Sequence, residues 1–396
     1  MEQKLSGLFK RAFSAVAFSL IAAFGRIVFG AKRTKDSDKI EGSAVIYCSH
    51  SSIFDFSYLV YAAYPKRIRF VARSFEFHKH PLYTWVLETL GFIPKKQGTT
   101  DVKCVREIVR ACRAGEIVAL YPAGMTSFDG RPAWDMQSGS GTLARLLATN
   151  VYVCTLHGAF LSAPRYTGKV SLGRVDVRLK KLFSAEEVKQ TQPDVLQHAI
   201  EQALDFNDWD WQENRRARFF RIKKMTGMNR VLYRCPVCAK EGDMVSEKKT
   251  LVCKACGLTV HRDKHGFLKS SDEKCPSRMD HWVDGQLESL KKELADPDFA
   301  LSDSVTLLTP IENETKYTSS DEGTLTLTKD ALAFSGKKDT LCWPLHDFQY
   351  FILNDVDFLH IFTGDTSFRF VFKNTALIDK WFFAHRLMTN GWTGGA

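Results

Sequence analysis

Two side chains that can move a proton, His50 and Asp55, lie five residues apart. The apolar run Ala44–Cys48 indicates a buried strand before them, and Ser51 and Ser52 are favoured at a helix start. This places the imidazole at the carboxyl end of a strand, where open α/β sheets form ligand crevices. A carboxylate folded back onto the ring would fix its tautomer and raise its basicity, leaving the other nitrogen to deprotonate a hydroxyl. Taken alone, this spacing is weak evidence for catalysis.

Cysteines supply a second candidate for chemistry. Four of the ten form two Cys-x-x-Cys pairs separated by fourteen residues: Cys235, Cys238, Cys253 and Cys256. Two such pairs complete a tetrahedral zinc site, and four cysteine ligands leave no open coordination position, so we expect a structural zinc ribbon. His261 and His265 are near enough in sequence to compete as ligands. A redox role fits less well, because neither pair opens a helix after a strand, and the pattern predicts a reducing compartment.

The composition is that of a globular protein with a basic bias. With 396 residues the chain is too long for one ordinary domain, and its 44% hydrophobic residues suffice for two or three cores. The formal net charge of +10 favours an anionic partner: a phospholipid surface, a nucleic acid or a phosphate-bearing substrate. The net charge does not distinguish among these partners. A soluble protein that is basic without having an anionic partner remains an alternative.

The first thirty residues have a pattern of their own. Apolar residues from Leu5 to Ile27 recur at helical spacing and form one apolar face. The uncharged stretch Ala12–Gly25 has fourteen residues, whereas a spanning helix needs about 20. We therefore expect a helix in the membrane interface, with Lys10, Arg11 and Arg26 at the head groups. A helix packed on the body of the protein is the alternative, and we expect no cleavable secretory signal.

From Lys39 the chain alternates short apolar runs with helical periodicity, which predicts an α/β domain with a mostly parallel sheet flanked by helices. The expected strands are Ala44–Cys48, Ile68–Ala72, Glu116–Tyr121, Val151–Leu156 and a strand pair within Lys169–Leu179. The expected helices are Phe54–Ala63, Pro81–Leu90, Thr100–Ala114, Gly141–Thr149 and Ser184–Asp205.

Four segments of this region share their order and spacing with one known family. They are His50-x4-Asp55, then Phe70–Arg73 with Pro81 and Leu90–Pro94, then Tyr121–Ser127, and finally the strand Val151–Leu156. The set resembles the glycerolipid acyltransferase family, of which lysophosphatidic acid acyltransferase is the familiar member. The resemblance covers about 150 residues, from about 40 to 190, and is specific as a set rather than motif by motif.

The resemblance implies an O-acyltransferase of the 1-acylglycerol-3-phosphate acyltransferase type. It would move an acyl group from acyl-CoA or acyl-carrier-protein to the hydroxyl of a lysophospholipid or related glycerolipid. His50 would be the general base, and Asp55 would orient it and stabilise the imidazolium. Backbone amides near the helix start would supply an oxyanion hole. The implied substrate-binding positions are Arg73, Lys95, Lys96, Pro122, Gly124, Thr126, Ser127 and Arg131.

The third motif departs from the family pattern, which is usually Phe-Pro-Glu-Gly-Thr-Arg-Ser. Ala123 replaces the Glu, Met125 the Thr and Thr126 the Arg, and Gln97 stands at the second-motif Arg. In the family these positions are thought to hold the glycerol phosphate, a task that suits a bidentate guanidinium. Three interpretations follow. Nearby cations could bind the phosphate instead, or the acceptor could be a lysophospholipid or glycolipid with a substituted head group. The third interpretation is that the activity has been lost. We favour a changed acceptor, because the rest of the motif and the His50 pair persist.

A third region follows Pro297, and from Ser304 onward the chain consists of short alternating strands and one final amphipathic helix, Ala376–Met388. The expected strands are Thr324–Thr328, Ala331–Phe334, Thr340–Leu345, Phe348–Leu353, Phe358–Phe362 and Ser367–Phe372. Six or seven strands closed by a helix that carries Trp381 resemble a PH/GRAM-like β-barrel. The resemblance implies a lipid-binding, partner-binding or purely structural domain.

The expected organisation has five parts: residues 1–30, a membrane-associating helix; 31–225, the acyltransferase domain; 230–266, the zinc ribbon; 267–300, a helical linker; and 301–396, the PH/GRAM-like domain. The leading hypothesis is a peripheral or monotopic enzyme of phospholipid biosynthesis at the cytoplasmic face of the cell membrane, with a lysolipid acceptor and an anionic lipid surface as partners. Alternatives are a catalytically inactive lipid-binding relative and a nucleic-acid-binding protein that uses the ribbon and the basic flank Arg215–Lys224. We do not expect nucleic acid, because this flank has no clear stacking platform and anionic head groups explain it equally well.

Overall fold

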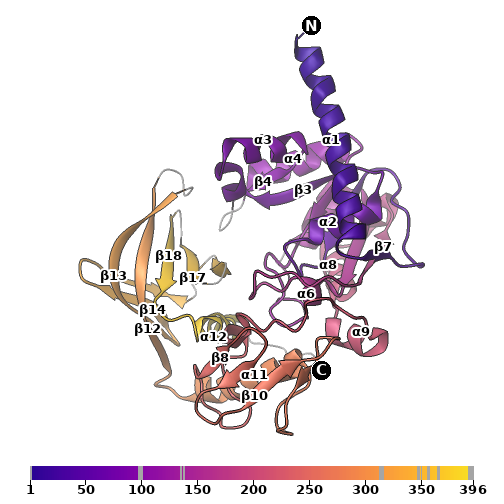
Figure 1. The fold of residues 1–396 in the computed structure, drawn as a ribbon. Coiled ribbons are helices and arrows are strands. Elements are labelled where there is room, and N and C mark those ends of the chain that lie inside the picture. Colours follow the sequence, from indigo (N-terminus) through magenta and orange to yellow (C-terminus); the bar gives the residue numbers. More distant parts are fainter. Residues whose placement is uncertain are drawn as a thin grey trace. The chain divides into compact units, whose positions relative to one another are not determined.

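The computed structural model describes residues 2–96, 101–133, 136, 139–311, 316–345, 348, 350–354, 357–363 and 366–390. The chain forms two compact units, which are described separately. Unit 1 runs to Ile222 and includes Lys264–Gly266, whereas unit 2 takes Lys223–Asp263 and continues from Phe267. Figure 1 shows the elements of both units.

Unit 1 is built on a mixed, mostly parallel sheet of seven strands in the order β1-β7-β6-β2-β5-β3-β4. β6 and β7 pair antiparallel, and the other neighbours pair parallel. The expectation of an α/β fold with a largely parallel sheet is therefore confirmed. The strands are β1 (Ala31–Arg33), β2 (Ala44–Cys48), β3 (Ile68–Arg73), β4 (Ile93–Lys95), β5 (Ile117–Leu120), β6 (Asn150–His157) and β7 (Val175–Phe183).

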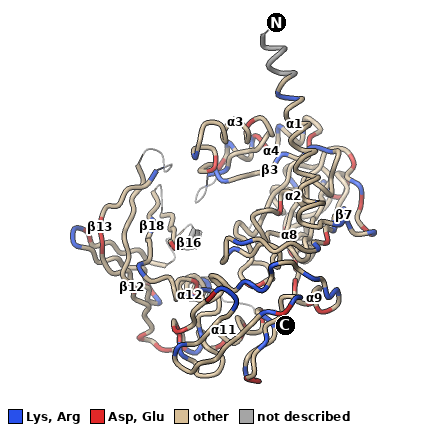
Figure 2. Tube along the Cα trace, in the orientation of Figure 1, with Lys and Arg blue, Asp and Glu red and all other residues tan. Residues whose placement is uncertain are grey.

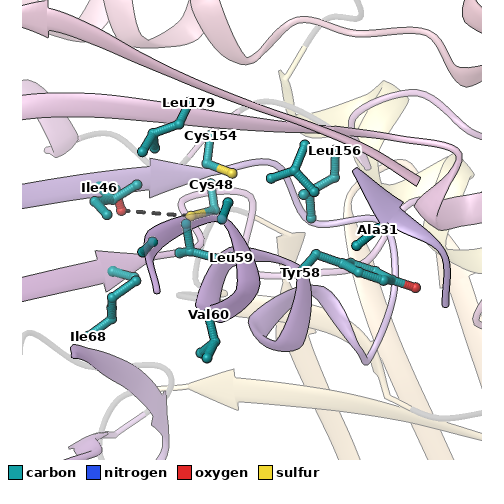
Figure 3. Close-up of a cluster of buried hydrophobic side chains, with 14 of the residues drawn as sticks. Ala31, Ile46, Cys48, Tyr58, Leu59, Val60, Ile68, Cys154, Leu156 and Leu179 are labelled. Carbon is teal, nitrogen blue, oxygen red and sulfur yellow. Dashed lines mark hydrogen bonds between the residues drawn. The ribbon is translucent and has the colours of Figure 1, made fainter. Parts of the chain in front are cut away.

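Helices cover both faces of this sheet, which explains the uninterrupted apolar runs of its central strands. Along β2, Ile46 and Cys48 face a core shared with α1 and α2, and Figure 3 shows this core. Val45 and Tyr47 face the opposite core, shared with α5, α7 and α8. The helices of unit 1 are α1 (Glu2–Ile27), α2 (Asp55–Ala63), η1 (Ser74–His78), α3 (Pro81–Thr89), α4 (Val102–Arg113), α5 (Ser140–Leu147), α6 (Ala159–Ser162), α7 (Ala185–Gln190), α8 (Pro193–Leu204) and α9 (Asp208–Arg215).

Helix α1 packs one face on the body of unit 1 and leaves the other uncovered. Phe18 and Ala22 are buried, and a Cβ at Gly25 would lie 2.7 Å from the Ser57 carbonyl oxygen of α2. Leu20 and Ile27 are 65% and 79% exposed. Residues 9–27 of α1 include no Asp or Glu, so this part of the tube in Figure 2 has no red segment. Among the helices within the described residues, none has the length and apolarity needed to cross a membrane.

Unit 2 combines a small antiparallel sheet, two helices and a large curled antiparallel sheet with its own helix. The small sheet has the order β11-β10-β9-β8, and the large sheet has the order β15-β14-β13-β12-β18-β17-β16. The elements are α10 (Met228–Val231), β8 (Met244–Ser246), β9 (Leu251–Cys253), β10 (Thr259–Arg262), β11 (Leu268–Lys269), α11 (Met279–Ala295), β12 (Ala300–Ile311), β13 (Lys316–Thr328), β14 (Ala331–Gly336), β15 (Thr340–Pro344), β16 (Tyr350–Asn354), β17 (Phe358–Thr363), β18 (Thr366–Phe372) and α12 (Ile378–Asn390).

The large sheet corrects the expectation of a closed barrel. Within the described ranges no pairing joins β15 to β16, so the sheet is an open half-barrel. Trp381 of α12 is buried, as expected, and its indole donates to Asp303 Oδ2 of β12 at 2.9 Å. The Lys380 ammonium is also buried and pairs with Glu241 and Glu293, so α12 is tied to the cysteine-containing segment and to α11.

Two expected elements differ clearly from the observed ones, and one observed strand was not among the expected set. The expected helix Ser184–Asp205 is broken into α7 and α8, because Pro193 lacks the amide that a continuous helix would need. The strand pair expected within Lys169–Leu179 is the single strand β7, which runs from Val175 to Phe183. Finally, β12 was not expected, and it pairs along its length with β13.

Candidate active site

The centre of the site is the His50–Asp55 pair, which the sequence pattern singled out. β2 ends at Cys48 and α2 begins at Asp55, so a short loop folds the carboxylate back onto the ring. Asp55 Oδ2 lies 2.8 Å from His50 Nδ1 and accepts the amides of Ser51 and Ser52 at 2.7 and 3.0 Å. When Asp55 is ionised it can only accept, so Nδ1 carries the proton and Nε2 is the basic nitrogen.

Burial gives the two members of the pair different roles. Asp55 is 1% exposed, and burial raises its pKa, whereas the His50 ring and the two amides act in the opposite direction. The His50 side chain is 24% exposed and reaches a cavity. The pair thus has a buried carboxylate behind an accessible imidazole, as general-base catalysis requires.

Three of the backbone amides near the helix start are already engaged, so they are not the donors of the oxyanion hole that the resemblance implies. The amides of Ser51 and Ser52 already donate to Asp55, and the amide of Phe54 donates to Ser52 Oγ at 3.1 Å. These three N–H groups are therefore engaged in holding the carboxylate and the loop. They position the Asp55 carboxylate against the His50 ring.

The third motif lies beside this pair because β2 and β5 are neighbouring parallel strands. The Tyr121 ring packs on the His50 ring with centroids 4.6 Å apart, and the Ser127 amide donates to the His50 carbonyl at 2.9 Å. Burial raises the pKa of Tyr121 well above its usual value, so its hydroxyl stays protonated. Ser127 is itself buried, and its Oγ accepts the Gly130 amide at 2.8 Å.

A cavity of about 450 Å³ opens at His50, and its size is typical of small-molecule sites. Its wall combines the first motif, the third motif and α8 with the residues that follow it. The lining residues are Cys48, Ser49, His50, Pro122, Ala123, Pro132, Met136, His198, Glu201, Gln202, Leu204, Asp205 and Phe206. Ala123, the position of the family Glu, therefore contributes only a methyl group to the wall.

The polar residues that α8 places on this wall were missed from sequence. His198, Glu201, Gln202 and Asp205 follow the spacing of one helical stripe. The opposite face of α8, with Leu196 and Ile200, is buried in the core. A polar stripe is also the usual pattern of a solvent-facing helix surface, so the sequence alone cannot distinguish a cavity wall from an exposed face.

The cations proposed for phosphate binding do not line the cavity. Arg131 pairs with Asp129, with its Nε at 3.0 Å from Oδ2, and Arg73 pairs with Glu76 at 2.9 Å. Among the lining residues that the structure describes, none is Lys or Arg.

The remaining expected substrate positions are spread around the site. Lys95 ends β4, and Lys96 is exposed, with its amide donating to Asp101 Oδ2 at 2.7 Å. Pro122 lines the cavity, whereas Gly124 and Thr126 lie outside its lining. Gly124 has a φ of +66°, which favours glycine in this turn. Gln97 lies outside the described residues.

The first turn of α9 braces the loops around the site, a feature that the sequence did not suggest. The Asp208 amide donates to the Gly130 carbonyl at 2.9 Å, and the Trp209 indole donates to the Asp129 carbonyl. The Asp208 carboxylate accepts the amides of Gly158 and Phe160 at 2.9 and 3.2 Å. One helix start therefore holds both the loop after the third motif and the loop after β6.

In unit 2, the four cysteine side chains converge as the zinc-ribbon interpretation requires. All four Sγ atoms lie within 4.8 Å of one another. Cys235 and Cys256 have their Sγ atoms 3.6 Å apart, and Cys238 and Cys253 have theirs 3.7 Å apart. Four thiolates at a Zn–S distance of about 2.3 Å in a tetrahedron would be separated by about 3.8 Å, so the geometry fits zinc. His261 and His265 do not belong to the cluster found among the described residues.

The comparison with family models gives a match within unit 1. The model of the acyltransferase family matches residues 30–157. None of the curated proteins compared with the chain matches it. Among solved structures, the chain is similar to the 1-acyl-sn-glycerophosphate (LPA) acyltransferase PlsC from Thermotoga maritima, with 16% identity, a TM-score of 0.40 and coverage of 50% of this chain and 87% of that chain.

The chain is also similar to a second solved structure, the C-terminal domain of an unknown protein from Leishmania infantum. It has 18% identity to this chain, a TM-score of 0.18 and coverage of 27% of this chain and 96% of that chain. The family match spans His50, Asp55 and the segment from Tyr121 to Ser127. The acyltransferase family model therefore matches the part of the chain that carries the candidate site.

Proposed function

We propose that the chain is an O-acyltransferase that moves an acyl group from an acyl thioester, either acyl-CoA or acyl-carrier-protein, to the hydroxyl of a lysolipid. The carrying observation is the 2.8 Å contact between His50 Nδ1 and Asp55 Oδ2 at the mouth of a cavity. The acceptor hydroxyl donates to His50 Nε2 and loses its proton to it as the oxygen attacks the thioester carbonyl. The C–S bond then breaks, and the leaving thiolate takes the proton from the imidazolium.

In this mechanism Asp55 is a positioning residue that also stabilises the imidazolium. It is buried and held by two backbone amides, so its oxygen stays in place while His50 gains and loses a proton. No covalent acyl-enzyme is required, because the acceptor oxygen is itself the nucleophile. The Tyr121 ring against His50 limits the ring orientations that can reach the cavity.

The uncovered face of α1 supports action at a membrane surface. Phe9, Val16, Leu20, Phe24 and Ile27 are exposed apolar residues of this helix. Lys10, Arg11 and Arg26 lie exposed on the same helix, where anionic head groups would meet them. We propose peripheral or monotopic attachment, at the cytoplasmic face because anionic lipids are concentrated in that leaflet.

A pair of variants tests the catalytic proposal. His50→Ala should lower kcat by a factor of about 10²–10⁴, because general-base catalysis usually accelerates a reaction by that factor. Asp55→Asn should lower kcat by a factor on the order of 10³, because the amide does not hold the reactive tautomer. Labelled acyl-CoA and acyl-carrier-protein are offered with a panel of lysophospholipids, glycerol phosphate and glycolipids. Exposed His78, on η1, provides the matched control His78→Ala, which should keep full activity.

Two outcomes would contradict this proposal. Acyl transfer that is unchanged in His50→Ala would exclude the imidazole as the base. A wild-type protein that binds lysolipid but transfers no acyl group to any acceptor would support the inactive lipid-binding alternative, in which Ala123 marks lost activity.

We also propose that Cys235, Cys238, Cys253 and Cys256 bind one structural zinc ion. Purified protein should contain about one zinc per chain, because four thiolates form a closed tetrahedral site. Cys253→Ser should lose most of this zinc and unfold at a lower temperature, as measured by elemental analysis and calorimetry. Cys275→Ser is the matched control, because Cys275 lies in unit 2 outside the cluster. Full zinc content in Cys253→Ser would refute the assignment.

A further inference from the structure

The polar stripe of α8 gives the cavity a chemical character. Glu201 and Asp205 are one helical turn apart, and both line the same cavity as His50. The position of Glu201 is fixed by Gln197, whose Nε2 donates to Glu201 Oε1 at 2.6 Å and whose Oε1 accepts the Gly141 amide at 2.8 Å. One carboxylate of the wall is therefore held by a chain of hydrogen bonds that leads to α5.

Backbone dipoles add to this negative charge. α8 ends at Leu204, and Asp205 is its C-cap residue, so the carboxyl end of the helix lies at the cavity wall. The last carbonyl groups of a helix carry a partial negative charge that favours cations. The Glu201 and Asp205 carboxylates and the carboxyl end of α8 therefore all make the electrostatic potential at this wall more negative.

The cavity wall thus has the opposite sign to the chain as a whole. The formal net charge is +10, yet no Lys or Arg occurs among the described lining residues. Arg131 and Arg73 are bound to Asp129 and Glu76, outside the lining. A phosphomonoester dianion would meet the Glu201 and Asp205 carboxylates here without a Lys or Arg among the described lining residues to offset them, whereas an ammonium group would be stabilised.

We propose, on the basis of the proposed function, that the acceptor is a lysophospholipid whose phosphate is esterified to an amino alcohol. Its free glycerol hydroxyl reaches His50, and its ammonium group pairs with Glu201 and Asp205. Ala123 leaves room for the substituted head group, because its methyl group replaces a carboxylate at the wall. Glu201 and Asp205 are then residues that determine acceptor specificity, separate from the His50–Asp55 chemistry.

The experiment compares three acceptors with one labelled acyl donor: lysophosphatidylethanolamine, lysophosphatidylglycerol and lysophosphatidate, each in mixed micelles of the same neutral detergent. The wild-type protein should use the ethanolamine lipid with the highest kcat/KM. The double variant Glu201→Gln/Asp205→Asn should raise KM for that lipid about tenfold, the usual size of a charge-pair effect, with little change in kcat. Its KM for lysophosphatidylglycerol should change far less.

A matched control and a charge reversal sharpen the test. Asp194 is exposed in the first turn of α8 and does not line the cavity, so Asp194→Asn should leave all three KM values unchanged. Glu201→Lys should raise kcat/KM for lysophosphatidate and lower it for the ethanolamine lipid. This opposite shift would not follow from a general loss of folding.

The outcomes separate this inference from the proposed function. Transfer that depends on His50 but is highest for lysophosphatidate or lysophosphatidylglycerol would overturn the acceptor assignment and leave the acyl-transfer chemistry intact. The acceptor assignment also fails if the double variant has the same KM for lysophosphatidylethanolamine as the wild-type protein. If none of the acceptors receives an acyl group in a His50-dependent reaction, the proposed function is refuted instead.

Discussion

Asp208 is a second buried carboxylate in unit 1, and the charge of Asp55 acts on it. Burial raises the pKa of Asp208 to about 8, while the amides of Gly158 and Phe160 act in the opposite direction. The unfolded chain releases this proton near pH 4, but the folded protein keeps it until about pH 8. The contribution of Asp208 to stability is therefore fully present at low pH and is lost as the pH rises through this window.

Asp208→Asn should remove this pH dependence. Between pH 5 and pH 8, the free energy of unfolding of the wild-type protein should fall relative to that of the variant by an amount on the order of 1 kcal/mol per pH unit. The variant loses one amide acceptor and is less stable at pH 5, so the slope and not the absolute value is the readout. Urea unfolding at several pH values measures it. Exposed Asp210, on the same helix, gives the control Asp210→Asn, and equal slopes in wild type and Asp208→Asn would contradict the prediction.

At the scale of residues, local geometry was predictable and distant packing was not. The contact of His50 with Asp55 follows from a strand end, a short loop and a helix start, which are all visible in sequence. The neutralisation of Arg131 by Asp129 depends on a side-chain conformation that spacing does not specify. Glu201 reaches the cavity only because α8 packs beside β2, a contact between segments far apart in the chain.

The element that most clearly positions the candidate site is the short helix α9. Trp209→Phe keeps an aromatic ring in the buried position but removes the hydrogen bond to the Asp129 carbonyl. The loop after the third motif then loses one anchor, and kcat should fall about tenfold, because small displacements of positioning groups are costly. Loss of this buried hydrogen bond should also destabilise the protein by about 1–3 kcal/mol. Acyl-transfer kinetics and thermal unfolding measure the two effects.

A second tryptophan of α9 provides the control for this variant. The Trp211 indole donates to Asp176 Oδ2 at 3.1 Å, a contact with β7 and not with the loop after the third motif. Trp211→Phe should therefore lower stability with little change in kcat. If both variants reduce kcat equally, or if Trp209→Phe alters only the unfolding temperature, α9 has no specific role in positioning the site.

At the scale of elements, periodicity located most of unit 1 but not the ends and edges. Pro193 was visible in the sequence, yet the apolar spacing continues across it and suggested one helix where there are two. β12 was missed because Asp303 and several Ser and Thr residues interrupt its apolar pattern, and only Val305 and Leu307 are buried along it. The half-barrel also shows that strand count does not determine closure, since closure depends on pairing between strands distant in the chain.

At the scale of the whole molecule, the question is how the proposed enzyme would reach a lipid substrate. The sequence left two interpretations of the first helix, an interfacial one and a packed one, and α1 has a face suited to each. The Phe13 ring packs against the Trp85 ring of α3, with centroids 4.9 Å apart and the rings tilted by 58°, so α1 is in contact with the rest of unit 1. Leu82 of α3 is 64% exposed and adds to the uncovered apolar residues of α1. Binding to a membrane would cover this surface without a spanning segment.

The double variant Leu20→Ser/Ile27→Ser tests this attachment. Both side chains are largely exposed, so the substitution should leave folding intact, but it removes apolar area from the uncovered face. Binding to vesicles that contain anionic lipid should weaken by about tenfold or more, because each fully buried aliphatic side chain contributes about 1.5–3 kcal/mol. Leu146→Ser/Val195→Ser removes two exposed aliphatic residues of α5 and α8 and should not change binding. Vesicle flotation measures the binding. An equal loss of vesicle binding in both double variants would mean that α1 is not the attachment surface. Acyl transfer to detergent-dispersed lysolipid needs no attachment to a membrane, so it should persist in both double variants.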